Sequence, residues 1–337
     1  MRAAMATAQV GDESRREDPT VNALSARVTE LLGKEDAIFL PSGTMCNQIA
    51  LLVHCGRGDE IIAAQNSHIA TSEGAGAAAL AGAFVREIPS ASGLFFAEDL
   101  IECLRPLGRP RAPRSRLVVV EQTHNRGGGT VWPLDRLQAV SGAARERGLA
   151  VHMDGARLMN AVVASGVATQ DLARCADSVW IDFSKGLGCP VGGMLAGTRE
   201  FIAKAWNWKY RLGGAMRQAG ILACAALHAL DHNVQRLAED HAKARAFGAA
   251  LAEVPGIGLN PAQIESNLVY FDIADTGLTA EALIRHLLEE GIRVGAEERT
   301  LLRAVTHLDV SAEEVDAAAA AIARICERHG ARQPAEV

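Results

Sequence analysis

A lysine and an aspartate each lie at the end of an apolar run, and both have side chains that can do chemistry there. Lys185 lies in D-F-S-K-G-L-G, directly after the run that starts at Ser178. Burial opposes the charged ammonium and favours the neutral amine, which can attack a carbonyl carbon to form an imine. Asp154 ends the run LAVHMD, and a carboxylate at a strand end can keep a cofactor's ring nitrogen protonated. Taken singly, Lys185 is typical of a surface loop and Asp154 of a helix N-cap.

A possible phosphate site lies where a short apolar run ends and a helical pattern begins, at Ser42, Gly43 and Thr44. The free backbone N–H groups and the positive end of a helix N-terminus both favour a bound phosphate. Arg217, in G-G-A-M-R-Q, offers a charged donor to the same phosphate or to the site of a neighbouring subunit. A simple capping turn and a solvated helix arginine are the alternative interpretations.

Two histidines and another arginine complete the candidates. His68 in N-S-H and His124 in E-Q-T-H-N each follow an apolar run, so one imidazole can stack on an aromatic cofactor and the other can accept a proton. Structural histidines are equally compatible with each position taken alone. Arg303 has apolar neighbours on an expected strand, where arginine usually meets a carboxylate of the protein or of a ligand. No H-x-E, H-E-x-x-H or C-x-x-C spacing occurs, so no metal site is expected.

These residues must be positioned by the strands and helices that the apolar pattern predicts. AIFL at 37–40 is a short strand before a helix, and three further apolar runs each end in polar residues: 117–124, 149–157 and 178–186. Fully apolar short runs that alternate with helical patterns predict a parallel sheet covered on both faces. Asp154 and Lys185 are 31 residues apart, about one strand–helix–strand unit, so both are expected at the same carboxyl edge.

The sequence predicts two domains. Residues 1–240 are expected to form a large α/β domain that binds the cofactor, with a mostly parallel sheet between helices. Residues 241–337 are expected to form a small α+β domain, with short strands near 267–273 and 302–310. The pattern over 216–254 predicts one long helix or two nearly continuous helices.

Composition excludes several classes of protein. The net charge of −6 and the absence of a long basic run argue against nucleic acid as a partner. No apolar stretch approaches the roughly 18 residues that span a membrane. The first residues lack the apolar core of a secretory signal, and the seven cysteines form no C-x-x-C pair. These features predict a reduced, cytoplasmic protein that acts on a small molecule.

As a set, the candidates are what a pyridoxal phosphate enzyme that acts on an amino acid requires. The sequence also resembles the threonine aldolases of the β-eliminating lyase family, which have the aspartate-aminotransferase-like fold of pyridoxal phosphate enzymes, known as fold type I. That fold implies a sheet of about seven strands sandwiched by helices. The segments that carry the resemblance are EDPTVNAL, FLPSGTMCNQIAL, GDEIIAAQNSHI, EQTHNRGGGTVWPL, HMDGARLMNA, DFSKGLGCPVGGMLAG, LGGAMRQAGIL, LAEDH and RAVTHLDVS.

The resemblance implies pyridoxal 5'-phosphate as the cofactor and assigns roles around it. Lys185 is implied as the lysine that binds the cofactor covalently, Asp154 as the partner of the pyridine nitrogen, and His68 as the residue over the ring. The full set of expected cofactor contacts is Ser42, Gly43, Thr44, His68, Asp154, Arg157, Lys185 and Arg217.

The resemblance also implies the reaction, which is cleavage of a β-hydroxy-α-amino acid such as L-threonine or L-allo-threonine to glycine and an aldehyde. His124 is expected to take the proton of the substrate hydroxyl, directly or through a water, and Arg157 and Arg303 to hold the substrate carboxylate. Catalysis is therefore expected from Lys185, His124, His68 and Asp154. A homotetramer or dimer with shared active sites is implied. A β-eliminating lyase, a racemase, and a catalytically impaired binding protein stay open as alternatives.

Two positions depart from the family's usual sequence. Family members usually carry R-S-D-T on a first strand, which supplies a serine to the substrate carboxylate, whereas this sequence starts with MRAAM. Arg15 stands where many relatives have a tyrosine that reaches the neighbouring subunit's site. Both departures concern contacts to the substrate, so the substrate preference stays open.

Overall fold

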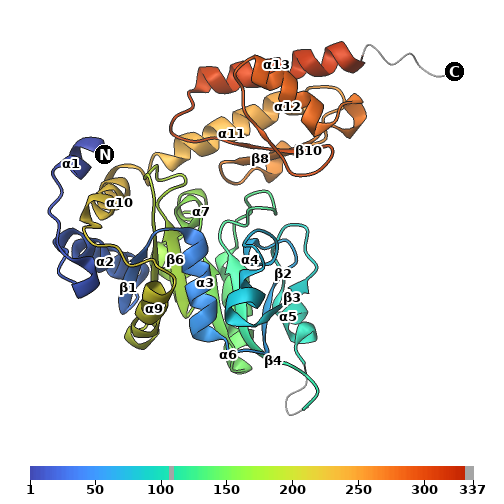
Figure 1. Cartoon of the computed structure of the whole chain (residues 1–337). Helices are drawn as coiled ribbons and strands as arrows, with labels where there is room; N and C mark the ends of the chain where they lie inside the picture. The colour runs from blue at the N-terminus through green and yellow to red at the C-terminus, as the bar shows by residue number, and fades with distance from the viewer. Residues whose placement is uncertain (106–109, 331–337) are drawn as a thin grey trace. The chain divides into compact units, whose positions relative to one another are not determined.

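The computed structural model describes residues 1–105 and 110–330 (Figure 1). The chain divides into two compact units. The first takes Met1–Gly127 and Val131–Gln235, and the second takes Gly128–Thr130 and the chain from Arg236 on. The division after Gln235 lies near the predicted domain boundary at residue 240, which falls inside a helix of the second unit.

The first unit is built on a seven-stranded sheet with the strand order β1-β7-β6-β5-β4-β2-β3 (Figure 1). Strands β2 to β6 pair parallel, and only β7 runs against its neighbours β6 and β1. The fold class predicted from the sequence is thereby confirmed. The strands are β1 (Asp36–Leu40), β2 (Asp59–Ala64), β3 (Phe84–Ile88), β4 (Arg114–Glu121), β5 (Ala150–Asp154), β6 (Ser178–Asp182) and β7 (Gly193–Gly197).

The central strands are buried on both faces, which explains their continuous apolar sequence. Every residue of β6 is buried, as are the last four residues of β5 and the last five of β4. β4 carries three consecutive valines, and β6 has Val179 and Ile181; such β-branched side chains pack well on a pleated surface. In the parallel register of β4 and β5, Glu121 lies beside Asp154, so two acidic side chains meet at the carboxyl edge of the sheet.

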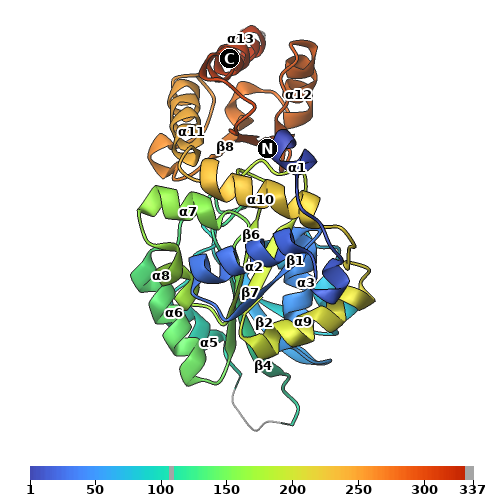
Figure 2. The ribbon, with the colours of Figure 1, turned by 90° about the vertical axis from the view of Figure 1, so that its left-hand side faces the viewer.

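Helices cover both faces of this sheet (Figure 2). α3 and α9 pack on one face against Ile38, Trp180 and Leu195, and on the other face α8 contacts α2, α6 and α7. The helices of the first unit are α1 (Arg2–Ala6), α2 (Pro19–Leu32), α3 (Gly43–His54), α4 (His68–Thr71), α5 (Ala97–Cys103), α6 (Leu134–Glu146), α7 (Leu158–Ser165), α8 (Thr169–Arg174), α9 (Arg199–Arg211) and α10 (Gly220–His232).

The second unit is a three-stranded antiparallel sheet with helices, as the sequence predicts for an α+β domain. Its core is formed by apolar residues from all of its helices, among them Phe247, Leu283 and Ile322. The long helical pattern is two helices, because residues 233–236 separate α10 from the next helix. The elements are α11 (Leu237–Ala252), β8 (Leu268–Asp272), α12 (Ala280–Glu289), β9 (Gly295–Ala296), β10 (Leu301–Val305) and α13 (Ala312–Gly330).

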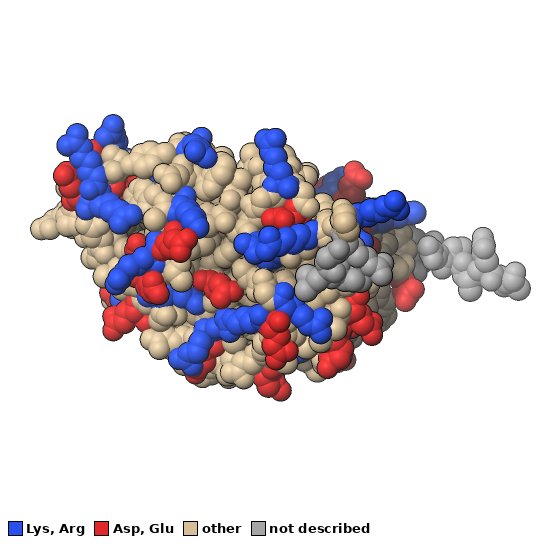
Figure 3. Space-filling model, turned by 90° about the horizontal axis from the view of Figure 1, so that it is seen from below, with Lys and Arg blue, Asp and Glu red and all other residues tan. Residues whose placement is uncertain are grey.

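The surface carries mixed charge. On the face shown in Figure 3, Lys and Arg side chains are interspersed with Asp and Glu, and no patch of one sign covers that face. Within residues 1–105 and 110–330, no helix combines the length and the apolar character that crossing a membrane requires.

Candidate active site

Three neighbouring strands of the first unit end in a buried carboxylate. β4 ends at Glu121, β5 at Asp154 and β6 at Asp182, and these three residues are 3%, 2% and 6% exposed. The carboxyl ends of parallel strands meet at one edge of a sheet, where open α/β folds bind ligands. Asp154 was predicted there, whereas Glu121 and Asp182 were not.

Asp154 is held by N–H donors on both oxygens. Its Oδ2 accepts a 2.7 Å hydrogen bond from Nδ2 of Asn47, and its Oδ1 accepts one of 3.0 Å from the backbone N–H of Ala156. Burial, with a further contribution from the charge of Glu121, raises the pKa of Asp154 to about 7, although Lys185 acts in the opposite direction. A cationic ring nitrogen placed beside Asp154 would favour the charged form of this carboxyl, as Lys185 already does.

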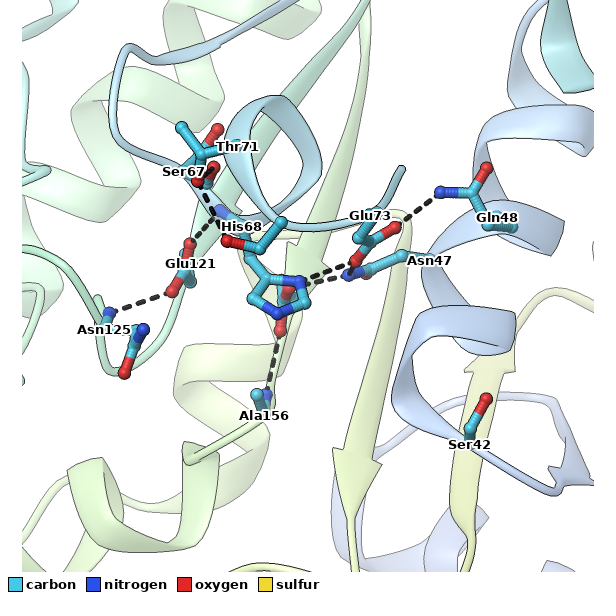
Figure 4. A network of polar contacts seen from close by, with 12 residues as sticks. Ser42, Asn47, Gln48, Ser67, His68, Thr71, Glu73, Glu121, Asn125 and Ala156 are labelled. Atoms are coloured by element: carbon cyan, nitrogen blue, oxygen red, sulfur yellow. Dashed lines mark hydrogen bonds and ion pairs between the residues drawn. The ribbon is translucent and has the colours of Figure 1, made fainter. Parts of the chain in front are cut away.

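His68 is fixed by a second buried carboxylate, Glu73. Its Nδ1 lies 2.8 Å from Oε1 of Glu73, and this hydrogen bond is the main reason why the pKa of His68 is raised. The backbone N–H of His68 donates to Oε2 of Glu121 at 2.8 Å (Figure 4). The His68 side chain is still 32% exposed. One polar atom from each of His68, Glu73 and Asp154 lies within 4.8 Å of the others, so the structure brings His68 and Asp154 close together.

His124 is buried in the loop after β4, with 1% of its surface exposed. The backbone N–H of Gly127 donates to its Nδ1 at 3.1 Å, so the neutral ring carries its proton on Nε2. Among the described residues, that Nε2 atom has no hydrogen-bond partner, although Oε2 of Glu121 lies 3.7 Å away. Burial lowers the pKa of His124. His124 in this geometry offers a donor, whereas the sequence predicts a proton acceptor.

Lys185 lies in the turn after β6 and is partly open. Its Nζ is 3.1 Å from Oδ2 of Asp182, and its side chain is 35% exposed rather than buried as the apolar run suggests. The hydroxyl and backbone N–H of Ser184 both donate to Oδ1 of Asp182 at 2.8 Å. Asp182 thus holds the ammonium of Lys185 beside the strand ends.

The predicted phosphate site is the first turn of α3. The hydroxyl of Ser42 caps this helix by accepting a 3.2 Å hydrogen bond from the backbone N–H of Met45. Ser42 and Thr44 are exposed. A Cβ on Gly43 would come within 2.2 Å of the Trp180 ring, so only glycine fits there. Nζ of Lys185 is 5.6 Å from the centre of the same ring, which places both Gly43 and Lys185 next to Trp180.

The three candidate arginines lie in different surroundings. Nη1 of Arg157 is 3.2 Å from Oδ1 of Asn125, in the loop after β4. Arg217 is 70% exposed and pairs with Asp12 at 2.7 Å, so its side chain is directed to the N-terminal segment. Arg303 is on β10 of the second unit, with its Nε 3.3 Å from Oε1 of Glu297.

Several polar residues of this site were not predicted. They are Asn47, Glu73, Glu121 and Asp182. Two had a usable signal, because Asp182 precedes Lys185 by three residues and Asn47 follows Gly43 by one helical turn. Glu73 had none, since it lies in a Gly- and Ala-rich stretch without a clear periodic pattern.

Comparison with known proteins gives a consistent result. The sequence pattern of the family described as "Beta-eliminating lyase" matches residues 1–274. "Low-specificity L-threonine aldolase 1" of Arabidopsis thaliana is 38% identical over 319 residues, which cover 94% of this chain and 89% of that protein. "Low specificity L-threonine aldolase" of Escherichia coli (strain K12) is 40% identical over 317 residues, which cover 94% of this chain and 92% of the relative.

Solved structures share the fold. A putative L-allo-threonine aldolase from Listeria monocytogenes EGD-E superposes with a TM-score of 0.80 at 22% identity, over 98% of this chain and 93% of that one. The threonine aldolase of Leishmania major superposes with a TM-score of 0.81 at 23% identity, over 96% of this chain and 94% of that one. At these identities the likeness shows the fold alone.

Proposed function

Because the chain belongs to the β-eliminating lyase family, we propose that it binds pyridoxal 5'-phosphate and cleaves a β-hydroxy-α-amino acid, L-threonine or L-allo-threonine, to glycine and an aldehyde. One observation carries this proposal. A buried carboxylate at the end of β5 and a lysine after β6 share one sheet edge with the open N-terminus of α3. The names of the relatives support the substrate class.

The residues present fit this cofactor. Asp154 offers a buried carboxylate to a cationic ring nitrogen, and the first turn of α3 would offer N–H groups to a phosphate. Lys185, held beside Asp182, would supply the amine, and the part-exposed His68 side chain would lie over the ring. Bound in this way, the cofactor supplies an electron sink for the pair of electrons released at Cα of the substrate.

Two imidazoles serve the substrate hydroxyl in different ways. His68 donates from Nδ1 to Glu73, so its Nε2 keeps a lone pair that can accept the hydroxyl proton. His124 carries its proton on Nε2 and can donate to the same oxygen. Under this assignment His124 donates a hydrogen bond to the hydroxyl oxygen, whereas the sequence analysis expects it to take the hydroxyl proton. The buried, unpartnered Nε2 of His124 supports it, because such an atom gains a hydrogen bond when substrate binds.

We assign binding of the substrate carboxylate to Arg157, and the family resemblance implies the same role for Arg303. A guanidinium holds a carboxylate with two parallel hydrogen bonds, which fixes the orientation of the bond to be broken.

We also propose that the protein is cytoplasmic and forms a homo-oligomer, a dimer or a tetramer, with active sites shared between subunits. All seven cysteines are free, which supports a reducing compartment.

The substitution Lys185→Ala tests the proposal. With L-threonine or L-allo-threonine as substrate, we expect the release of glycine and acetaldehyde to fall by about a hundredfold or more. The matched control is Lys204→Ala, since Lys204 is an exposed lysine of α9 that pairs with the exposed Glu200. The activity of this variant should equal that of the unaltered chain. Release of a keto acid and ammonia, or inversion of the substrate without cleavage, would instead indicate the β-eliminating or racemising alternative. If the unaltered chain forms no product and binds no pyridoxal phosphate, the alternative of a catalytically impaired binding protein is favoured.

A further inference from the structure

The side chain of Asn47, on α3, lies at the junction of the two buried carboxylates. It is fully buried, and its Nδ2 donates to Oδ2 of Asp154 at 2.7 Å and to Oε1 of Glu73 at 2.6 Å. Both hydrogens of the amide are thus used on acidic groups. Figure 4 shows Asn47 and Glu73 on one side of the His68 ring. Gln48, which follows Asn47 on α3, lies beyond them.

The orientation of this amide is fixed by its other end. Oδ1 of Asn47 accepts from Nε1 of Trp180 at 2.7 Å, and an indole N–H is only a donor. The oxygen must therefore face Trp180, and the NH₂ group must face the carboxylates. Nε2 of His152 lies 3.1 Å from the same oxygen and must also donate to it.

The chain of hydrogen bonds behind His152 is directional as well. Because Nε2 of the neutral ring carries the proton, Nδ1 accepts from the hydroxyl of Ser178 at 2.8 Å. The Ser178 oxygen then accepts from Nε2 of His54, also at 2.8 Å. Burial lowers the pKa of His152 to about 3 and that of His54 to about 4, so both rings are neutral, as this chain requires.

Asn47 also answers an electrostatic problem. One oxygen of Asp154 and one of Glu73 lie within 4.8 Å of each other in a buried setting, where like charges repel strongly. The two N–H groups of Asn47 place partial positive charge between them. Glu73 in turn holds Nδ1 of His68, so one amide fixes both the partner of the ring nitrogen and the ring-covering histidine.

We propose that Asn47 is a positioning residue, which holds Asp154 and, through Glu73, the His68 ring in a single arrangement before the cofactor binds. This inference rests on the proposed function for the identity of the ligand. It does not depend on the reaction that follows.

The test compares Asn47→Ala with Gln48→Met in the full chain freed of cofactor. Gln48 is the next residue of α3 and donates only to Glu73, so its loss leaves Asp154 untouched. By titration with pyridoxal 5'-phosphate, we expect the Kd of Asn47→Ala to rise about tenfold or more, since a hydrogen bond to a charged group is lost. The Kd of Gln48→Met should change less than about threefold.

A second readout needs no cofactor. In ¹⁵N-histidine spectra of the unaltered chain, the signals should show the His68 proton on Nδ1. In the Asn47→Ala chain, the signals of both His68 ring nitrogens should shift. If Asn47→Ala does not fold, Trp180→Phe replaces it, because this change removes the N–H that orients the amide and keeps an aromatic ring; the same shifts and a raised Kd are expected.

Two results would overturn the inference: a folded Asn47→Ala chain with unchanged Kd and unchanged His68 signals, or equal effects from Asn47→Ala and Gln48→Met. Failure of the proposed function looks different. The unaltered chain would then bind no pyridoxal phosphate, while the His68 signals would still report whether Asn47 positions the ring.

Discussion

The chemistry of the two site histidines is decided by one neighbouring atom each. Glu73 accepts from Nδ1 of His68 and leaves its Nε2 free, whereas the N–H of Gly127 occupies Nδ1 of His124 and leaves a proton on Nε2. Residue type alone therefore does not tell which histidine accepts a proton. The hydrogen-bond partner of the opposite ring nitrogen does.

Replacing Glu73 should move the pH profile. His68 accepts a proton only when it is neutral, and Glu73, assisted by the charges of Asp154 and Glu121, raises its pKa above the ordinary value of about 6.5. Activity is therefore lost as pH falls through that raised pKa. In Glu73→Gln the pKa falls, so the acid limb of kcat/KM should move to lower pH while its maximum decreases. If the acid limb of kcat/KM stays at the same pH in Glu73→Gln, His68 is not the proton acceptor.

At the scale of elements, the first turn of α3 combines a cap, a close contact and an open face. Ser42 satisfies one backbone N–H of this turn, while Gly43 lets the Trp180 ring approach. Ser42 and Thr44 are exposed, so this turn is open to solvent. The helix start is thus stabilised by a residue that lies next to the expected phosphate.

Ser42→Ala should separate the two roles of that turn. The lost cap costs about 1 kcal/mol in the free energy of unfolding, measured by urea denaturation. Because the hydroxyl is also expected on the phosphate, the Kd for pyridoxal phosphate should rise as well. Thr198→Ala is the control, since Thr198 caps α9 through the N–H of Phe201 at 3.1 Å. Thr198→Ala should lower the free energy of unfolding by a similar amount and leave the Kd for pyridoxal phosphate unchanged. Equal Kd values for the two variants would show that the phosphate does not bind at the first turn of α3.

At the scale of the whole molecule, the N-terminal segment is tied to distant parts of the first unit by buried charges. Lys209 of α9 is fully buried and pairs with Glu13, whose other oxygen accepts from the backbone N–H of Met216 at 3.0 Å. Asp18 accepts from Gly220 at 2.9 Å, so a second carboxylate ties the same segment to the start of α10. The segment is thereby part of the folded unit.

Lys209→Met should leave Glu13 buried without its cation. Breaking a buried pair from one side costs about 3–5 kcal/mol, because the remaining charge stays desolvated. Thermal and urea unfolding of the variant should both show this loss. Lys204→Met removes an exposed partner of Glu200 on the same helix and should leave the free energy of unfolding unchanged. Equal stability of the two variants would show that the Glu13 pair contributes little.

The sequence by itself determined the fold class, most of the strands and helices, and the pair Asp154 and Lys185 at one sheet edge. These depend on local signals: fully apolar runs mark buried parallel strands, and the residues after each run lie at the carboxyl edge.

Only the tertiary structure decided how the site is held. Asn47, Glu73 and Glu121 come from three separate segments, and their contacts depend on strand register and helix packing rather than on spacing. It also decided which ring nitrogen of His68 and of His124 is occupied by a hydrogen-bond partner, and it showed that Arg217 pairs with Asp12. The physical reason is that a hydrogen bond reaches only about 3 Å, so side-chain chemistry is set by neighbours in space, which the order of residues in the chain does not specify.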